Sequence, residues 1–361
     1  MSVIIETAGL PPERLLFTPS PLAELTAMLH VLAEPAHHPA LHGWAGTTAA
    51  ALRPELADRL LEADFLWRSS RADFLLPAIP GASLAEELDA IDRLDDERYV
   101  AGALIASCGL NRLALRPHSP LTDPVERERA IELANARGPR QAAFADRLLS
   151  DPAAVRAIVR RLLEDCAEAF FADAWARVLP VLAADARHKA DLLAHRGLAE
   201  ALAAVSPAVG YDARQGRIVI DKLQSSSTSA ASTGLTFVPT VFGRPHLVVV
   251  YAAGWRPVVQ YPVAESGVQA PAALDRVQQR LEALANPARL RLARTLARGE
   301  HTTGELAAAW QLTEPEVSRH LAVLRRAELV LSRRRGRYVL YRLDLGVSAR
   351  LGTDLLEAVL R

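Results

Sequence analysis

The stretch from residue 302 to residue 321 reads TTGELAAAWQLTEPEVSRHL and contains the pattern Thr-x-x-Glu twice, at 302–305 and at 313–316. In this pattern, called a capping box, the Thr hydroxyl accepts a hydrogen bond from the backbone of the Glu, and the Glu carboxylate accepts one from the backbone of the Thr. Each copy marks the start of a helix. The sequence therefore predicts two short helices joined by a turn at 310–312, which is the arrangement of a helix-turn-helix.

The second of these helices, expected at about 314–327, separates apolar from polar side chains. At about 100° per residue, Val317, Leu321 and Leu324 share one face and are predicted to pack inward. The opposite face is small or polar, so this helix can enter the major groove of DNA, where Arg319 could donate to guanine. The residues predicted to contact DNA from this helix and its cap are Thr313, Pro315, Glu316, Ser318, Arg319, His320 and Arg326. His320 lies nearer the packed side, so bracing the helix is an equally open role for it.

A hairpin is predicted downstream, where LVLSRRRGRYVLYRLDL (329–345) alternates apolar and polar residues around a turn at 335–336. Four guanidinium groups at one tip repel one another unless a polyanion lies nearby, so this tip is predicted to hold the phosphate backbone of DNA. The alternative is an ordinary solvated turn. The arginines at 333–337 are Arg333, Arg334, Arg335 and Arg337.

Together these segments resemble the ArsR/SmtB family of winged-helix repressors. The resemblance covers roughly residues 273 to 345 and is carried by NPAR (286–289), SRHL (318–321) and GRYVLYRL (336–343). It implies a repressor that binds double-stranded DNA at a near-palindromic operator. One departure is Glu328, because the family usually has a glycine before the Leu-Val pair, and this places the local helix cap in question.

The resemblance also implies a homodimer. Its interface is expected to combine the helix that starts near Ala273 with a C-terminal helix, and the alternative is a monomer on half a site. The residues expected at this interface are Leu274, Val277, Leu281, Leu351, Leu355 and Val359.

The metal sites of the family cannot be carried over to this chain. Its third helix lacks the Cys-x-Cys of metal sensors, since the matching stretch reads ELAAAW (305–310), and the terminal helix offers only Asp354 and Glu357. Methyl groups cannot bind a soft metal. In the N-terminal half, His37, His38 and His42 raise the question of a metal site, but a solvated loop near a buried Trp44 is the preferred interpretation. We expect no metal and no cofactor, and an effector that is a small molecule.

The remaining chain predicts an α+β protein. Residues 1–264 are expected to form a mostly helical body with strands near 216–263 in a small antiparallel sheet, residues 265–272 a linker, and residues 273–361 the winged helix-turn-helix domain. The serine-rich stretch 224–233 reads as a flexible hairpin loop. The body resembles the uncharacterised domain that precedes the winged helix in many actinobacterial regulators. That resemblance implies no known activity, so a ligand-sensing or dimer-bracing role is expected.

Composition bounds the function further. The formal net charge is 0, yet residues 272–361 hold 16 arginines and 10 acidic residues, a net charge of +6 that favours a nucleic-acid partner. No apolar stretch is long enough to span a bilayer and no signal peptide begins the chain, which predicts a soluble, cytoplasmic protein without a membrane partner. Cys108 and Cys166 are predicted to be buried thiols.

We find no catalytic motif in this sequence and expect no enzyme. Two rival hypotheses stay open. In one, the winged helix is a protein-interaction or dimerisation module for a ligand-binding body. In the other, the body is an enzyme fused to its own regulator.

Overall fold

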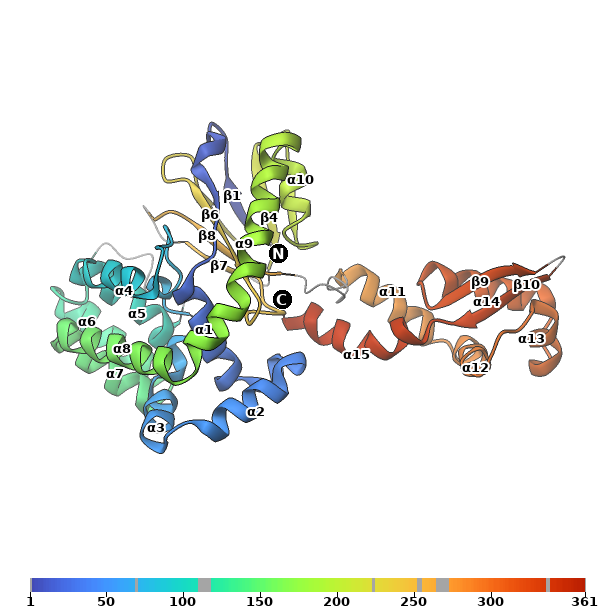
Figure 1. Cartoon of the computed structure of the whole chain (residues 1–361), viewed down its shortest axis with the longest axis horizontal. Helices are drawn as coiled ribbons and strands as arrows, with labels where there is room; N and C mark the ends of the chain where they lie inside the picture. Colours follow the sequence, from blue (N-terminus) through green and yellow to red (C-terminus); the bar gives the residue numbers. More distant parts are fainter. Residues whose placement is uncertain are drawn as a thin grey trace. The chain divides into compact units, whose positions relative to one another are not determined.

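The computed structural model describes residues 2–68, 71–109, 118–222, 225–251, 255–263, 273–335 and 338–360. The chain divides into two compact units, Met1–Gln269 and Ala270–Arg361, whose elements are labelled in Figure 1. The linker predicted at 265–272 lies outside the described residues, as does Arg337, one of the predicted phosphate contacts.

The first unit is mainly helical. Several of its helices begin where a serine or aspartate side chain accepts a hydrogen bond from the first turn, as Ser20, Asp95 and Asp151 do. Its α-helices are α1 (Pro21–Ala33), α2 (His42–Ala51), α3 (Pro54–Ala63), α4 (Leu84–Asp92), α5 (Asp96–Cys108), α6 (Pro124–Asn135), α7 (Pro139–Ser150), α8 (Pro152–Cys166), α9 (Ala172–Arg196) and α10 (Leu198–Ala203). Its short helical turns are η1 (Pro12–Arg14), η2 (Pro35–His37), η3 (Pro39–Leu41), η4 (Asp64–Leu66), η5 (Asp73–Leu75) and the π-helical η6 (Ala167–Phe171).

Two four-stranded sheets complete the first unit. Their strands are β1 (Ser2–Glu6), β2 (Leu15–Phe17), β3 (Val209–Asp212), β4 (Arg217–Asp221), β5 (Ser226–Ser229), β6 (Leu235–Thr240), β7 (Val248–Val250) and β8 (Val258–Pro262). The strand orders are β3-β4-β1-β5 and β2-β6-β8-β7.

The predicted α+β class is confirmed, but the single antiparallel sheet is corrected to two mixed sheets. The pairs β1–β5, β2–β6 and β6–β8 are parallel, whereas β1–β4, β3–β4 and β7–β8 are antiparallel. Part of the difference arises because β1 and β2 enter these sheets from the start of the chain, far in sequence from their partners. The rest arises because β8 pairs in parallel with β6 and leaves β7 at the edge of the sheet.

The serine-rich stretch also differs from its prediction as a loop. Ser226–Ser229 forms β5, an edge strand that pairs in parallel with β1, with Val3 opposite Ser226 and Ile5 opposite Thr228. Backbone hydrogen bonds to β1 can hold such a strand without apolar side chains of its own. A pattern of hydrophobic residues therefore could not reveal it.

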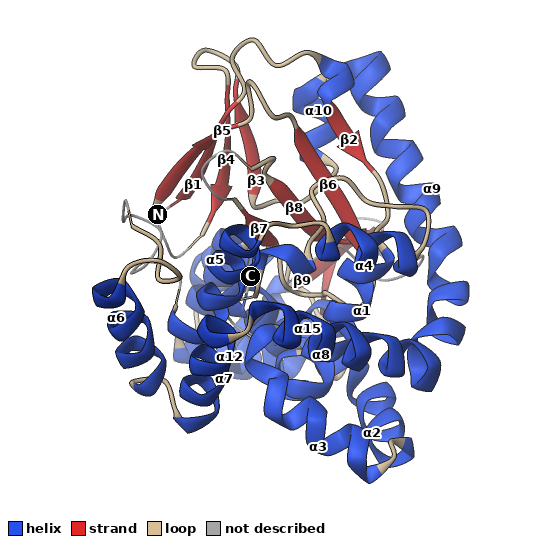
Figure 2. Ribbon diagram, turned by 90° about the vertical axis from the view of Figure 1, so that its left-hand side faces the viewer, coloured by secondary structure: helices blue, strands red, loops and turns tan. Residues whose placement is uncertain are grey.

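Two large cores fill the first unit. One joins the helices around the fully buried Trp67 and Tyr99, and the other lies between the sheets and α9, where Leu182 meets Phe237 and Tyr261. Figure 2 shows α9 running beside β2 and β6. Cys108 and Cys166 are free and buried in the helical core, which confirms the prediction of thiols.

The second unit has the predicted order of four helices, a hairpin and a terminal helix. These elements are α11 (Leu274–Leu284), α12 (Pro287–Leu296), α13 (Thr303–Trp310), α14 (Glu314–Arg326), β9 (Val330–Arg335), β10 (Tyr338–Leu343) and α15 (Leu345–Leu360). The start of α12 shows why the local pattern was informative, since Asn286 accepts hydrogen bonds from Ala288 N and Arg289 N and Pro287 occupies the first turn.

Across the described ranges of both units, we find no helix with the length and apolar character needed to cross a membrane.

The buried Asp73 of η5 should make the stability of the first unit depend on pH. Its side chain is 4% exposed, and burial raises the pKa of its carboxyl from 3.8 to about 7. Because the folded protein then binds the proton more tightly than the unfolded chain, stability that is present below about pH 4 is lost as the pH rises through about 7. We expect Asp73→Asn to raise the free energy of unfolding at pH 8 by on the order of 3 kcal/mol, with little change near pH 4.

Urea unfolding followed at both pH values measures this difference. The matched control is Asp58→Asn, which changes an exposed aspartate of α3 and should leave the pH dependence of the parent intact. An Asp73→Asn variant whose stability varies with pH as the parent's does would contradict the assignment.

Candidate nucleic-acid interface

Both predicted capping boxes are present and fix the starts of α13 and α14. At α13, Thr302 N donates to Glu305 Oε2 at 2.7 Å and Glu305 N donates to Thr302 Oγ1 at 3.2 Å. At α14, Thr313 N donates to Glu316 Oε2 at 2.9 Å and Glu316 N donates to Thr313 Oγ1 at 3.4 Å. The Thr backbone N–H groups lower the pKa of both Glu carboxyls, because these bonds favour the charged form.

The turn between the two helices is tight and left-handed at one residue. Gln311 has a φ of 53°, and Leu312 N donates to the carbonyl oxygen of Ala307 at 3.1 Å, which ends α13. The predicted inward face of α14 is confirmed, since Val317, Leu321 and Leu324 are at most 1% exposed. The orientation of α14 about its own axis is therefore fixed by its packing.

The opposite face of α14 is open to solvent. The side chains predicted to contact DNA have different accessibilities, because Glu316 folds back onto the cap and His320 turns partly toward the packed side. The exposed ones are Thr313, Pro315, Ser318, Arg319 and Arg326, and Ala322 lies exposed among them. A small residue between two arginines leaves room for this face to approach another surface closely.

The hairpin of β9 and β10 forms the wing. Its strands pair antiparallel, with Arg333 opposite Leu340 and Arg335 opposite Tyr338. A short bridge extends this ladder, because His301 N donates to Tyr341 O and Tyr341 N donates to His301 O, each at 2.9 Å. The loop after α12 thereby ties the wing to the helices.

Arg333 has an anionic partner within its own unit, which the sequence does not predict. Its guanidinium makes a two-pronged ion pair with Glu300, with Nε to Oε1 at 2.7 Å and Nη2 bonded to Oε2. The hydrogen bond from Arg333 lowers the pKa of Glu300, so this carboxylate stays charged. The sequence pattern predicts that the wing arginines need a polyanion and does not reveal this partner within the chain. Arg334 and Arg335 lie exposed on the same strand.

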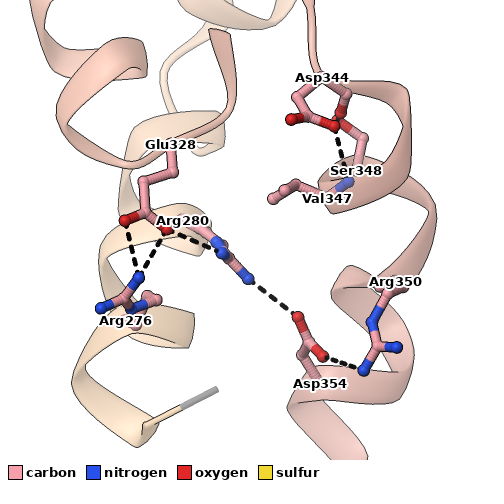
Figure 3. Close-up of polar contacts among 8 residues, drawn as sticks. All are labelled: Arg276, Arg280, Glu328, Asp344, Val347, Ser348, Arg350 and Asp354. Carbon is pink, nitrogen blue, oxygen red and sulfur yellow. Dashed lines mark hydrogen bonds and ion pairs between the residues drawn. The ribbon is translucent and has the colours of Figure 1, made fainter. Parts of the chain in front are cut away.

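A network of ion pairs holds α11 against α15, as Figure 3 shows. Arg280 of α11 is almost buried, and its Nη1 lies 2.9 Å from Asp354 Oδ2 of α15. Arg350 reaches the other oxygen of Asp354 at 3.3 Å. At the start of α15, Asp344 Oδ1 accepts a hydrogen bond from Val347 N at 3.1 Å. The inner side of α15 is therefore polar.

Glu328 joins the same network from the end of α14. Its φ is 59°, in the left-handed region that favours glycine, so the departure from the family's glycine places a side chain in a strained conformation. The carboxylate bonds Arg276 Nη1 at 2.7 Å through both oxygens and lies 3.2 Å from Arg280 Nη2. These ion pairs offset part of the strain.

Several apolar residues of α11 and α15 face outward, although Val347 of α15 packs against the core. Val359 is 60% exposed, and Leu274 and Leu281 of α11 are 47% and 40% exposed, whereas Leu351 and Leu355 are half-buried. Val277 is fully buried, so the prediction that it faces a partner chain is corrected: it packs inside its own unit. Leu356, which the sequence analysis did not single out, is 45% exposed on α15.

Comparisons with known proteins divide the chain near the boundary between its two compact units. Residues 1–267 match the family of unknown function DUF5937, and residues 286–332 match the bacterial regulatory protein, arsR family. The first match bears out the expected uncharacterised domain, and the second bears out the expected ArsR-type domain.

Among curated relatives, the chain is 48% identical over 71 residues to the biofilm growth-associated repressor of Agrobacterium fabrum, covering 20% of this chain and 61% of the relative. It is 42% identical over 74 residues to the HTH-type transcriptional regulator Rv2034 of Mycobacterium tuberculosis, covering 20% of this chain and 69% of the relative. The chain spans 48% to 61% of the first three curated relatives it matches. A solved structure, reduced HlyU from Vibrio cholerae, is 34% identical, covers 22% of this chain and 84% of that chain, and has a TM-score of 0.20.

The Arg280–Asp354 ion pair should contribute more than the other ion pairs of α15 to holding this helix against α11. We expect Asp354→Ala to destabilise the docking of α15 by about 3–5 kcal/mol, because removal of one partner leaves a buried guanidinium without its main counter-charge. Hydrogen exchange of the α15 amides in the full chain measures this loss.

Two further variants separate the pair from its surroundings. Arg350→Ala removes only the more exposed partner of Asp354 and should cost less than about 1 kcal/mol. The double variant Arg280→Met with Asp354→Leu should recover much of the stability lost in Asp354→Ala, since an apolar pair leaves no charge buried. If Asp354→Ala and the double variant lose the same amount of stability, the Arg280–Asp354 pair is not what holds α15.

Proposed function

This chain belongs to the family of unknown function DUF5937 and carries a bacterial regulatory domain of the arsR family, and from this premise we propose that it is a sequence-specific transcriptional repressor. It binds double-stranded DNA as a homodimer at a near-palindromic operator, with half-sites about one helical turn apart. The repressor role is supported by the names of relatives such as the Agrobacterium repressor.

One observation carries the proposal: α14 presents a solvent-exposed face of small and polar side chains while its apolar face is fully buried. A helix that is unpartnered on such a face fits the major groove, which is about 12 Å wide. In this placement Pro315, Ser318 and Arg319 of its N-terminal half reach the base edges, and Arg319 donates to guanine. Glu316 acts mainly by capping the helix, because its carboxylate already accepts the Thr313 N–H.

The wing supplies phosphate contacts in this proposal. Arg334 and Arg335 are exposed on β9, and the proposal includes a further phosphate contact from Arg337, which lies outside the described residues. Arg333 has a double role, because its ion pair with Glu300 orients the wing, and the Glu300 carboxylate offsets the charge of the guanidinium before DNA binds. The wing therefore adds affinity that does not depend on sequence.

The homodimer rests on the apolar residues of α11 and α15. Leu274, Leu281, Leu356 and Val359 are each at least 40% exposed, and Leu351 and Leu355 lie between them and the interior. A two-fold axis through this surface would bury the same side chains from both copies. It would also leave α14 of each copy free for one half-site.

The rival proposal makes the winged helix a protein-interaction module for a ligand-binding body. The exposed arginines of α14 and β9 favour DNA over a protein partner, because several guanidinium groups on one unit need an anionic partner and the phosphate backbone of a duplex supplies one. The expected small-molecule effector gains no support from the hollow between Leu88, Tyr99 and Leu163, whose volume of about 10 Å³ suits about one water.

Two arginine variants distinguish base reading from phosphate contact. Arg319→Ala should weaken binding to the operator by about 1–3 kcal/mol and reduce the preference for operator over random duplex. Arg335→Ala should weaken binding to both duplexes alike. It should also reduce the slope of log affinity against log salt concentration by about 1, as expected for the loss of one phosphate contact. Fluorescence anisotropy at several salt concentrations measures both effects.

The control for these variants is Arg53→Ala, which removes the same charge from an exposed position in the first unit. It should bind like the parent. The proposed interface is wrong if Arg319→Ala and Arg335→Ala also bind operator and random duplex as the parent does.

A charge on the outer side of α15 tests the homodimer. Val359→Asp should raise the dimer dissociation constant at least tenfold, because the symmetric contact would bury two carboxylates among apolar side chains. Analytical ultracentrifugation measures the constant. Val125→Asp is the matched control, since Val125 is 70% exposed in the first unit and should tolerate the charge. A Val359→Asp variant that dimerises as tightly as the parent places the interface elsewhere.

A further inference from the structure

Four histidines come together inside the first unit from three separate segments. His30 lies on α1, His37 and His38 lie at the end of η2, and His246 lies between β6 and β7. One nitrogen from each of His30, His37 and His246 lies within 4.8 Å of the other two. The ring centroid of His38 is 5.0 Å from that of His30 and 5.1 Å from that of His246.

This grouping corrects the sequence-based interpretation of the region. His38 is 1% exposed, and His37 is half-buried, so these residues are not part of a solvated loop. His42 is exposed, as expected, and its Nε2 hydrogen-bonds the carbonyl oxygen of Pro35 at 2.7 Å, but it is the first residue of α2 and not part of a loop. Trp44, which was expected to be buried, is half-buried.

Backbone carbonyls set which nitrogen of two rings carries the proton. His30 Nδ1 lies 2.9 Å from the carbonyl oxygen of Trp67, and His38 Nδ1 is hydrogen-bonded to the carbonyl oxygen of Arg244. A carbonyl can only accept, so each Nδ1 is the donor and each neutral ring keeps a lone pair on Nε2. Histidines that bind metal are commonly oriented by a hydrogen bond of this kind from the other ring nitrogen.

Hydrogen bonds among the described residues do not account for all the nitrogens of these four rings. His30 Nε2 lies 3.2 Å from His246 Nε2, and a hydrogen bond between them would account for that pair. It would still leave His37 Nδ1 and His38 Nε2, which are buried and have no hydrogen-bond partner among the described residues. The 3.2 Å separation also matches the distance of about 3.3 Å between two nitrogens that share a tetrahedral zinc ion at about 2.0–2.1 Å.

A buried carboxylate fixes the loop that leads to His246. Glu24, on the same helix as His30, accepts hydrogen bonds from Val241 N and Phe242 N at 3.0 Å each and from Thr240 Oγ1. These bonds hold the segment after β6 against α1 and bring His246 toward His30. The buried Arg71 is the opposing feature, since its charge disfavours a second cation, but its Nη1 is directed to Gln260 Oε1 at 2.6 Å.

We propose that His30, His37 and His246 bind a divalent transition metal that prefers imidazole, with zinc as the ion to test, and that His38 Nε2 lies beside it as a fourth nitrogen. Three neutral nitrogens suit Zn²⁺ and its neighbours better than Ca²⁺ or Mg²⁺, which require oxygen ligands. The site belongs to the first unit alone. It is therefore independent of DNA binding, and failure of the proposed repressor function would leave it standing.

The test uses the full-length chain, freed of metal with a chelator and titrated with Zn²⁺ by calorimetry and with Co²⁺ by visible absorption. We expect one equivalent of either ion to bind the parent protein. His37→Ala should weaken binding more than tenfold, and because His37 is only half-buried, this variant is the one expected to keep the fold. His246→Gln should weaken binding similarly. Circular dichroism verifies that each variant is folded.

The matched control is His42→Ala, which removes a histidine from the same segment outside the group and should bind metal like the parent. X-ray absorption of the zinc-loaded parent should show nitrogen ligands at about 2.0–2.1 Å. The proposal is overturned if the parent binds no ion, if folded His37→Ala binds as tightly as His42→Ala, or if the bound zinc has only oxygen ligands.

Discussion

The orientation of α14 depends on how the chain turns between Trp310 and Thr313. Gln311 adopts a left-handed conformation that ends α13, and two residues later the Thr313–Glu316 capping box starts α14. Once that start is fixed, the helical period places Val317, Leu321 and Leu324 on the buried side. The opposite face of α14 is then exposed to solvent or available to a ligand. A local hydrogen-bond requirement thus decides which side chains the unit presents.

The second unit could be predicted from the sequence because its signals are local. A capping box and the Asn286-Pro287 pair each lie within four residues of the helix start that they determine. The sheets of the first unit were harder to predict. Ile5 of β1 pairs with Ile218, and Phe17 of β2 pairs with Phe237, so each partner lies more than 200 residues away. No local pattern specifies such a pairing, which explains why β1, β2 and β5 were missed. The strand β3 at Val209–Asp212 also lies outside the predicted region, although its partner β4 is close in sequence.

The same limit applies to side chains that act together. Proximity in sequence grouped His37 with His42, whereas folding brings His246 to His30 across 216 residues. Likewise, the acidic residues at 354 and 357 were considered only as metal ligands, but Asp354 pairs with Arg280 across 74 residues. In neither case did residue type and local spacing alone predict the interaction that the structure shows. The sequence does not reveal which residue each of these side chains contacts, because burial and long-range packing determine it.

The charge of the second unit shows why these partners matter. Its net charge of +6 would make two copies repel, and a symmetric dimer brings the same surface of each copy together. The ion pairs of Arg276 and Arg280 with Glu328 and Asp354 neutralise the side formed by α11 and α15. This allows an apolar contact there without a buried charge that lacks a partner. Arg319 and Arg335 remain exposed on α14 and β9, so positive charge is kept where a polyanion would bind and is neutralised where a second copy would bind.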